Sequence, residues 1–511
     1  MRKNNGFIYF LAIVKFIIPY LLQSNVYEPH RDEFLYLAEG HHMAWGFMEI
    51  PPFLSIFAWL THLFGDGIFW IKFWPDLFGV LTFIVTAKII QSLGGKAFAI
   101  FLAFLPFVFG IYLRLFFLFQ PNAPEVFLWT MMAYSLIRYI QTNKNYYLYI
   151  FGVSVGLGTA TKYSVAFFLV SILGGVLLTS QRKIFLNKHL YFAGILAMLI
   201  FMPTFIWEYN HHFPIMVHMK ELQRTQLQFI SPGDFLKDQL LMNLPCVFIW
   251  IGGLFFATFS SKGKNYRVFA WAFIFVLALL ISFHGKNYYA LGLYPMLFAF
   301  GAFHLEKFSE KRSRFWRYSF VLIPVLLGLT FVPISLPVAK PAELAELYQK
   351  MGIVKTGALK WEDLQNHQLP QDFADMLGWE EMTQKMAKAY NSLDSNGKAH
   401  TFLFCDNYGE AGAVNYYRYK YGLPEVYSDN GSFLYWMPRN IHLYNLLLIT
   451  DDQEEMEHPF VKYFSSAVVT DSVTNIYARE RGTLIILFKG ANEAMNKMFS
   501  EKINADYNKF K

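Results

Sequence analysis

The feature that most constrains this chain is a series of long apolar stretches along its first two thirds. A bilayer core of about 30 Å is crossed by about 20 apolar residues in a helix. Stretches of this kind recur between residues 7 and 335 and predict eleven membrane spans. We expect these spans at 7–23, 67–90, 97–118, 123–141, 146–160, 163–180, 188–207, 238–259, 267–283, 287–304 and 315–335. The first one lacks a small-residue cleavage site after it, so we expect an uncleaved span.

The composition agrees with a polytopic α-helical membrane protein. Of 511 residues, 55% are hydrophobic and only 16% are charged, whereas soluble domains carry about 25% charged residues. The net charge of +7 does not indicate a nucleic-acid partner, because the Lys and Arg residues lie in short loops and form no basic stripe. Cys246 lies in an apolar span and Cys405 in a polar segment, so we expect both to be unpaired.

The distribution of positive charge predicts the orientation. With the N-terminus inside, the inner loops hold fifteen Lys and Arg residues, Arg2 and Lys3 among them, and the outer loops hold six. Cytoplasmic loops are enriched in these residues. The first loop, 24–66, therefore faces outward. Its apolar segments 32–45 and 53–64 are too short to span, so we expect helices that lie at the membrane interface.

The chain changes character near Pro337. Residues 1–337 form the predicted membrane domain, and 338–511 are richer in Glu, Asp, Lys and Asn. Strand-like runs alternate there with helical patterns, which predicts a small extracytoplasmic α/β domain. We expect strands at 400–405, 445–450, 467–470 and 483–488, and helices at 379–392 and 409–421.

An acidic pair, Asp32 and Glu33, lies directly after the first span. Carboxylates beside hydrocarbon are costly, so a chain that keeps two of them there usually uses at least one. The other polar side chains of interest also lie at outer ends of spans, which predicts one site on that side of the membrane. They are Glu49, Arg114, Glu125, Lys162, Lys286, Tyr288 and Tyr289.

Simpler explanations exist for each of these residues. Asp32 and Glu33 are equally suited to cap a helix, and Glu125 to begin one. Lys and Arg near helix ends often only extend to the interface, and Tyr288 and Tyr289 fit an aromatic belt. His211 and His212 are adjacent, and adjacent side chains rarely face one ion.

The first loop resembles a known family. His30 to Ala38, with its Asp-Glu pair and Tyr36, followed by Pro51-Pro52, is similar to the first-loop signature of the dolichyl-phosphate-mannose protein mannosyltransferase-like superfamily. Further segments resemble the family in the same order along the chain. They are Asn122 to Glu125, Leu157 to Tyr163, Pro203 to Trp207, and Gly285 to Tyr289 with Tyr294-Pro295.

This resemblance implies a GT-C fold with about 11 to 13 transmembrane helices and transfer of a sugar from a polyprenyl phosphate. The acceptor would be a lipid, glycan or protein on the outer face of a bacterial inner membrane. The family includes the aminoarabinose transferase of lipid A. That branch has a Glu-Lys-Pro where this chain has Glu49-Ile50-Pro51, and an Arg where Leu35 stands. We therefore do not extend the resemblance to the aminoarabinose substrate.

The mechanism expected is direct displacement, which inverts the anomeric centre. Asp32 would take the proton of the acceptor alcohol, with Glu33 supporting the site. Arg114, Lys162 and Lys286 would stabilise the departing lipid phosphate. No cofactor is required, although Asp32, Glu33 and Glu49 have the chemistry to bind a divalent metal.

Two other functions are compatible with an apolar chain of this kind. One is a transporter or lipid flippase, which would be expected to show internal repeats and charges near the membrane midplane. The other is a structural or polymer-assembly protein whose C-terminal region binds partners. Release of free polyprenyl phosphate distinguishes the transferase from both.

Overall fold

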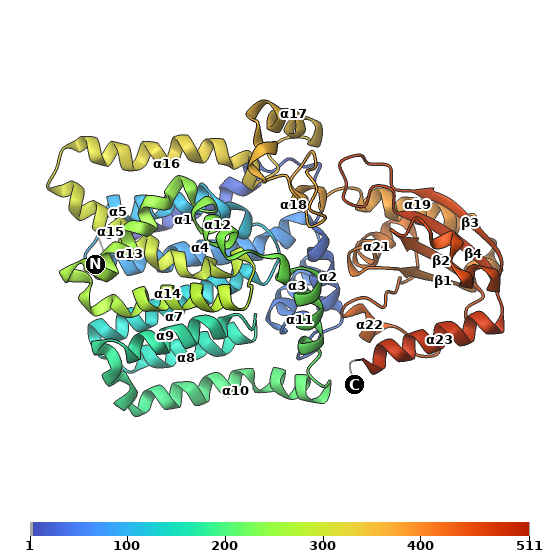
Figure 1. Cartoon of the computed structure of the whole chain (residues 1–511), viewed down its shortest axis with the longest axis horizontal. Helices are drawn as coiled ribbons and strands as arrows, with labels where there is room; N and C mark the ends of the chain where they lie inside the picture. Colours follow the sequence, from blue (N-terminus) through green and yellow to red (C-terminus); the bar gives the residue numbers. More distant parts are fainter. Residues whose placement is uncertain (1–3, 510–511) are drawn as a thin grey trace.

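The computed structural model describes residues 4–509, so the predicted inner-loop residues Arg2 and Lys3 lie outside the described part. A helical bundle occupies one side of the molecule, and a smaller region containing a sheet occupies the other (Figure 1). The bundle helices are α1 (Asn5–Leu22), α4 (Ile68–Leu93), α5 (Ala97–Val108), α6 (Ile111–Leu115), α7 (Asn122–Thr142), α8 (Tyr146–Thr159), α9 (Val165–Leu177), α10 (Lys188–Asn210), α12 (Pro232–Leu241), α13 (Val247–Phe259), α14 (Arg267–Ser282), α15 (Tyr294–Glu310) and α16 (Arg314–Ser335).

Shorter helices lie where the bundle meets the sheet-containing region. α2 (Arg31–His41) and α3 (Phe53–Phe64) agree with the two interfacial helices expected in the first loop, and α11 (Pro214–Thr225) lies near them (Figure 1). Single turns of 3₁₀ helix connect several elements. They are Ser180–Leu186, Leu227–Phe229, Leu244–Cys246, Ser261–Tyr266, Asn287–Leu293, Ile353–Thr356, Glu455–Glu457 and Pro459–Tyr463.

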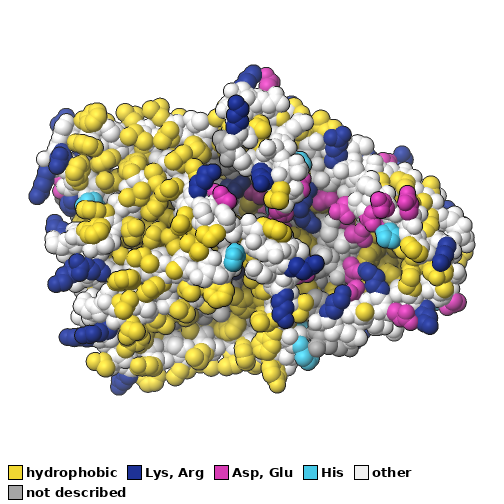
Figure 2. All heavy atoms as spheres, viewed as in Figure 1, with side chains coloured by type: hydrophobic (Ala, Val, Ile, Leu, Met, Phe, Trp, Pro, Cys, Tyr) yellow, Lys and Arg dark blue, Asp and Glu magenta, His cyan; other side chains and the backbone are white. Residues whose placement is uncertain are grey.

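Several bundle helices are suited to a membrane. Among the described residues, five helical segments are long and apolar enough to cross one, and seven if each of two bent pairs counts as one span. Only 17% of the apolar window of α10 is buried, so most of that helix faces outward with hydrophobic side chains. Figure 2 shows hydrophobic side chains over the visible face of the bundle. Such a surface is stable in lipid and costly in water. The chain is a multi-pass membrane protein, and the total of eleven spans stays a prediction.

Three of the expected spans are not continuous helices. The span expected at 238–259 consists of the end of α12, a 3₁₀ turn and α13, with a bend of 65° at the break. The span expected at 97–118 breaks after Val108, because Gly110 has a φ of +138° that only glycine adopts readily. The span expected at 287–304 begins as a 3₁₀ turn and becomes α-helical only at Tyr294, where Pro295 occupies the first helical turn. The sequence interpretation was wrong at these three places because hydropathy does not report backbone geometry.

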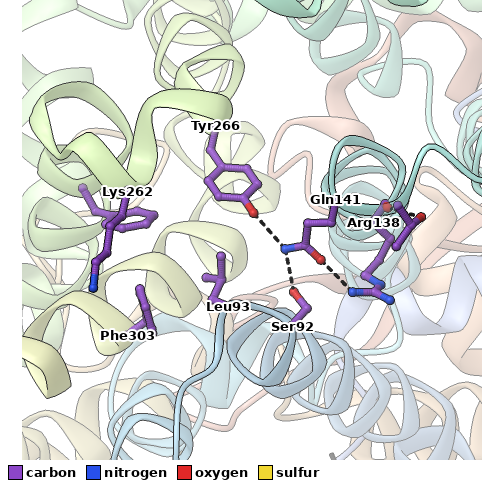
Figure 3. Close-up of a pocket in the computed structure, with 9 residues that line it drawn as sticks. Ser92, Leu93, Arg138, Gln141, Lys262, Tyr266 and Phe303 are labelled. Atoms are coloured by element: carbon purple, nitrogen blue, oxygen red, sulfur yellow. Dashed lines mark hydrogen bonds between the residues drawn. The ribbon is translucent and has the colours of Figure 1, made fainter.

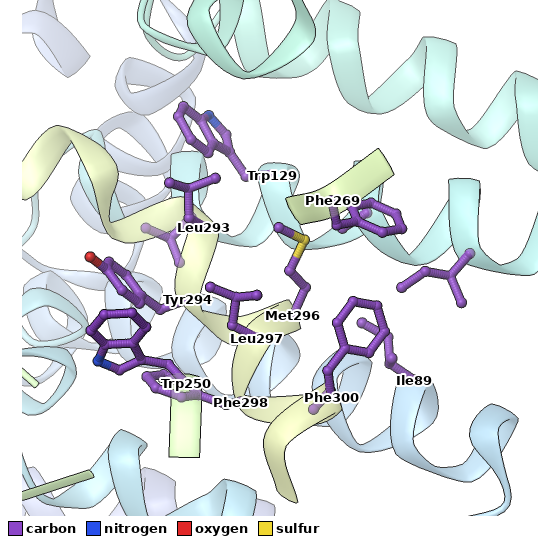
Figure 4. Packing of buried hydrophobic residues seen from close by; sticks show 14 of the residues in the cluster. Ile89, Trp129, Trp250, Phe269, Leu293, Tyr294, Met296, Leu297, Phe298 and Phe300 are labelled. Atoms are coloured by element: carbon purple, nitrogen blue, oxygen red, sulfur yellow. The ribbon is translucent and has the colours of Figure 1, made fainter. Parts of the chain in front are cut away.

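Close packing joins the helices of the bundle. Gly152 on α8 lies so near α10 that a Cβ there would meet the Ala193 carbonyl oxygen at 2.3 Å. The core around α15 is filled with aromatic and aliphatic side chains such as Trp250, Tyr294 and Phe300 (Figure 4). Trp129 on α7 stacks on Phe168 with the ring centroids 4.5 Å apart. The bundle is therefore a rigid support for the loops at its ends.

The C-terminal region contains a four-stranded sheet in the order β1-β2-β4-β3, in which β1 and β2 are parallel and the other pairs antiparallel. All four strands lie where the sequence predicted strands, and so do α19 and α21. Buried Cys246 and Cys405 are unpaired, as expected. The elements are α17 (Pro341–Met351), α18 (Gln371–Ala374), α19 (Trp379–Asn391), α20 (Ser395–Ala399), β1 (Thr401–Cys405), α21 (Tyr408–Tyr421), α22 (Phe433–Trp436), β2 (Asn445–Thr450), β3 (Phe464–Ser472), β4 (Leu484–Ala491) and α23 (Glu493–Asn508).

The first loop is fastened to this C-terminal region through α2. Phe34 on α2 is buried and packs edge-on against Trp379 of α19 and Tyr416 of α21, with ring centroids 5.6 and 5.4 Å away. Gly412 on α21 lies directly against Phe34, because a Cβ at Gly412 would come within 2.8 Å of the Phe34 Cβ atom. The helix that carries Asp32 and Glu33 is therefore held between the bundle and the C-terminal region.

Candidate active site

The sequence around the acidic pair folds as a helix N-terminus. The ring of His30 accepts the backbone N–H of Asp32 through Nδ1 at 3.1 Å, and Glu33 accepts the backbone N–H of His30 at 2.8 Å. This reciprocal pattern is a capping box, and negative side chains in the first turn are favoured by the helix dipole. Capping of α2 thus explains why acidic side chains stand in its first turn.

Glu33 is fully buried and fully paired. Both of its carboxylate oxygens accept hydrogen bonds from Lys72 of α4, at 2.6 and 2.7 Å, and Oε1 also accepts the backbone N–H of Phe119 at 2.6 Å. A buried charge in such a site is stabilised by its partner and by the hydrogen bonds around it. This carboxylate therefore joins α2 to α4.

Asp32 differs from its neighbour because it is only half-buried. Its Oδ1 accepts the hydroxyl of Tyr408 at 2.9 Å, and its Oδ2 accepts the side-chain amide of Gln120 at 3.1 Å. Both partners donate, so the two oxygens of the carboxylate are held in one orientation. Sequence reasoning missed Tyr408, because it lies in the C-terminal region and no local motif marks it.

A chain of hydrogen bonds connects Asp32 with Lys162. Gln120 donates to Asp32, Asn122 donates to Gln120 at 3.2 Å, and Lys162 donates to Asn122 at 2.6 Å. Gln120 and Asn122 flank Pro121 at the start of α7. The sequence alone did not assign either of these two residues to the site. Pro121 was the signal available, because it places the two amides on one tight turn.

Three of the predicted site residues gather around a fourth, Lys162. Its Nζ lies 3.4 Å from a carboxylate oxygen of Glu125 and lies over the rings of Tyr289 and Tyr288, 4.3 and 5.2 Å from their centroids. Glu125 also accepts a hydrogen bond from Ser164. An ammonium on aromatic faces keeps its charge at low cost, so the arrangement is a partly buried cationic centre.

The remaining predicted residues contact the C-terminal region. Glu49 accepts the backbone N–H of Ser432 at 2.8 Å and its hydroxyl at 2.5 Å. Arg114 forms an ion pair with Asp372, and the ammonium of Lys286 lies 3.9 Å from Glu362. None of these three has a hydrogen bond or ion pair with Asp32 among the described residues.

Asp372 lies among several charged side chains close to the N-terminal end of α2. Burial acts to raise the pKa of Asp372, but the Arg114 guanidinium, with His30 and Lys286, holds it well below its usual range. The neighbouring Asp375 lies 3.4 Å from Arg479. Burial raises the pKa of Asp375 to about 6 despite His30 and Arg479. The first of these ion pairs joins α6 to α18, and the second joins the end of α18 to Arg479.

Glu39 is an exception to the paired pattern. It is fully buried on α2, and neither carboxylate oxygen has a hydrogen-bond partner among the described residues. It lies on the same face of the helix as Asp32 and Tyr36, because seven residues make about two turns. Burial, with the charge of Glu49, raises the pKa of Glu39 well above its usual range. We infer that this carboxyl group is neutral.

The described residues contain three groups with ligand chemistry for a metal ion. In one of them, His30 uses Nδ1 to accept the Asp32 N–H, and Asp372 and Asp375 already pair with Arg114 and Arg479. Both carboxylates of that group thus have a cationic partner, whereas Nε2 of His30 lies 3.6 Å from Asp375 and has no hydrogen-bond partner among the described residues. The other two groups are His41, His62 and Asp66, and Asp452, Glu455 and His458.

A cavity of about 330 Å³ lies away from these residues (Figure 3). It is lined by the C-terminal ends of α4 and α7, where Gln141 bonds Ser92, Tyr266 and Arg138. None of the predicted site residues lines it. The candidate site is therefore defined by the contacts of Asp32 and Lys162 rather than by this cavity.

Comparison with known proteins gives a partial family match and a matching fold. Residues 49–207 match the family described as dolichyl-phosphate-mannose-protein mannosyltransferase. The structure matches ArnT from Cupriavidus metallidurans bound to undecaprenyl phosphate with a TM-score of 0.63 and 13% identity, covering 94% of this chain and 97% of that one. The chain has the GT-C fold of this ArnT structure, while the family match covers less than a third of its length.

A second structure agrees with this fold. ArnT from the same organism in the apo state matches with a TM-score of 0.60 and 12% identity, over 94% of this chain and 97% of the other. No curated protein matches the sequence. The family match includes Lys162 and Glu125 but begins after Asp32, so the role of Asp32 in this GT-C protein depends on its geometry.

Proposed function

We propose that this GT-C protein is an inverting glycosyltransferase. It moves a sugar from a polyprenyl phosphate to a hydroxyl group of a lipid, glycan or protein at the outer face of a bacterial inner membrane. The observation that carries the proposal is the hydrogen-bonded chain from Asp32 through Gln120 and Asn122 to Lys162. It connects a half-buried carboxylate with a partly buried ammonium, the two charges that such a transfer needs.

Asp32 is the proposed base. The acceptor oxygen attacks the anomeric carbon and forms the new glycosidic bond, while its proton passes to the Asp32 carboxylate. The bond between the anomeric carbon and the phosphate oxygen breaks at the same time and leaves polyprenyl phosphate. Tyr408 and Gln120 hold the two oxygens of Asp32 in place, while Glu33 and Lys72 fix the helix beneath it.

Lys162 is the proposed partner of the departing phosphate. Negative charge grows on that group in the transition state and is stabilised by a fixed cation. Glu125, Asn122 and the two tyrosines orient the ammonium. Lys286 and Arg114, each paired with a carboxylate of the C-terminal region, supply further positive charge. No step of this reaction requires a metal or another cofactor.

The proposed location follows from charge. Lys and Arg side chains gather at the end of the bundle away from the C-terminal region (Figure 2), which is the pattern of a cytoplasmic face. The first loop and the C-terminal region then lie outside. Glu49 contacts Ser432 across this junction, so we propose that the C-terminal region completes the site.

A transporter or lipid flippase remains the alternative function. It would move the lipid without breaking the bond between sugar and phosphate. The transferase is favoured by the similarity to the mannosyltransferase family and by the pairing of Asp32 with two donors at the end of the bundle rather than at its middle.

The test is an assay of polyprenyl phosphate release. The purified chain in lipid nanodiscs would be given undecaprenyl-phosphate sugars and an extract of envelope lipids and glycans. We expect Asp32→Asn to bind the donor normally and to lose transfer by about 100-fold or more, whereas Lys162→Gln should weaken donor binding. Transfer at a near-normal rate by Asp32→Asn would refute the assignment of the base. Lipid movement without release of polyprenyl phosphate would support the flippase.

A further inference from the structure

The cavity of about 330 Å³ lies at the opposite end of the bundle from the candidate site (Figure 3). α7 begins at Asn122, which bonds Lys162, and ends at Thr142, which lines the cavity. At about 1.5 Å per residue, the 21 residues of this helix span about 30 Å, the thickness of a bilayer core. The cavity therefore lies at the other face of the membrane, where Lys and Arg side chains gather (Figure 2).

The hydrogen bonds around the cavity leave donors available to a ligand. Gln141 donates its amide to the Tyr266 hydroxyl at 2.8 Å and to Ser92 at 3.1 Å. The carbonyl oxygen of the same amide accepts Arg138 at 2.6 Å. Tyr266 acts as an acceptor in this network, so its own hydroxyl hydrogen is available for a further bond. By contrast, Ser92 and Thr142 spend their hydrogens on backbone carbonyls of their own helices.

Two cations line this cavity without a carboxylate partner. Arg138 bonds only neutral groups, the amide of Gln141 and the hydroxyl of Tyr147, the latter at 3.2 Å. Lys262 forms no hydrogen bond or ion pair within the described part of the chain. In Figure 3 the two cations lie on opposite sides of Gln141 and Tyr266. A ligand between them would therefore meet positive charge from both sides.

The negative charge near the cavity does not cancel these cations. Glu306 lies one turn along α15 from the lining residue Phe303. It accepts the backbone N–H groups of Lys96 and Ala99 at 2.9 and 3.1 Å and so caps α5. The carboxyl ends of α4 and α7 each carry about half a negative charge. Two full positive charges exceed this sum, so the cavity favours an anion.

Apolar side chains line the rest of the cavity. They include Phe256 of α13, and Phe259, one turn further along that helix, is 72% exposed. The 3₁₀ segment Ser261–Tyr266 packs tightly on this end of α13, because a Cβ at Gly263 would overlap the Phe256 carbonyl oxygen. A fixed, positively charged hollow beside exposed apolar surface fits a molecule with an anionic head and apolar chains.

We propose that this cavity binds the phosphate group of an anionic membrane lipid, in the leaflet opposite the candidate site. Arg138 and Lys262 pair with the phosphate oxygens, for which a guanidinium is well suited, and the Tyr266 hydroxyl donates a further hydrogen bond. Basic pockets between helices at the cytoplasmic side are a known type of site for such headgroups. The site is separate from the proposed sugar transfer and does not depend on it.

The test is lipid binding by the full-length chain, purified in detergent and freed of bound lipid. Native mass spectrometry during titration with phosphatidylglycerol should show saturable binding. Phosphatidylcholine, which has no net charge, should bind about 10-fold more weakly or less. The double variant Arg138→Gln, Lys262→Gln should weaken phosphatidylglycerol binding by about 20-fold, since each basic side chain contributes about 5-fold to the affinity for an anionic lipid.

Because Arg138→Gln also removes hydrogen bonds within the fold, Lys262→Gln alone is a second variant. Lys262 is exposed, and its loss should weaken binding by about 5-fold. The matched control is Lys264→Gln, Arg314→Gln, which removes the same charge from exposed positions outside the cavity and should bind like the parent.

Inorganic phosphate distinguishes a lipid headgroup from a soluble phosphate. At equal concentration it should not displace phosphatidylglycerol from the parent chain. The proposal is overturned if the cavity variants bind phosphatidylglycerol like the control pair, if phosphatidylcholine binds as tightly, or if inorganic phosphate displaces the lipid.

Discussion

Tyr408 donates its hydroxyl to Asp32 at 2.9 Å, although the two residues are 376 positions apart in the sequence. The tyrosine begins α21 in the C-terminal region, and the aspartate begins α2 in the first loop. The C-terminal region therefore contributes directly to the candidate site. It also holds α2 through Phe34, so both the position and the hydrogen bonding of Asp32 depend on it.

Removing this hydroxyl should impair the proposed transfer. We expect Tyr408→Phe to lower kcat by about 10-fold or more, since a hydrogen bond to a charged group contributes about 1.5 to 3 kcal/mol. Donor binding should not change. The measurement is release of polyprenyl phosphate, with exposed Tyr419→Phe as the control. Equal rates for the two variants would show that Tyr408 does not position Asp32.

The pair formed by Glu33 and Lys72 should matter for stability. Glu33→Gln leaves the buried Lys72 ammonium without its counter-charge, so we expect a loss of about 3 to 5 kcal/mol in the free energy of unfolding. The double variant Glu33→Gln, Lys72→Met should recover part of this loss. Thermal unfolding in detergent measures both. A single variant as stable as the parent would contradict the assigned role.

Replacing Glu39 should stabilise the fold, in contrast to replacing Glu33. Its carboxyl group is buried without a partner among the described residues, and burying such a group costs about 1 to 3 kcal/mol. We therefore expect Glu39→Met to raise the melting temperature. Glu33→Gln, measured beside it, should lower that temperature. A lower melting temperature for Glu39→Met would mean that the carboxyl group has a partner, such as bound water.

Glu28 should make stability depend on pH. Its carboxylate accepts the backbone N–H groups of Trp379 and Glu380 at 2.9 and 3.0 Å, yet burial raises the pKa of Glu28 to about 7. The unfolded-state pKa is near 4.5. The folded state thus binds the proton more tightly, so this stabilisation is complete below pH 4.5 and is lost as the pH rises through 7.

The matching variant is Glu28→Gln, which keeps an oxygen acceptor but cannot ionise. Relative to the parent, it should gain about 1 to 3 kcal/mol in the free energy of unfolding between pH 4.5 and 8. Melting temperatures of both proteins at the two pH values give the comparison. A difference between parent and variant that is the same at both pH values would contradict the raised pKa.

Much of the secondary structure could be predicted because it depends on local patterns. Apolar length located the bundle helices, and short β-type runs located all four strands. The breaks at Gly110 and before Tyr294 could not be predicted from hydropathy, because both segments remain apolar while the backbone turns. In the site, Lys162, Glu125, Tyr288 and Tyr289 were predicted together and lie together.

What the sequence by itself determined was where long apolar helices form, and that an acidic pair follows the first of them. Hydrophobic burial depends on composition and periodicity, and both are local. Only the tertiary structure decided which of the two acids forms a buried ion pair. Lys72 reaches Glu33 from α4, while Tyr408 and Gln120 reach Asp32 from α21 and the turn before α7. Hydrogen bonds act over about 3 Å, so packing alone brings such distant residues into contact.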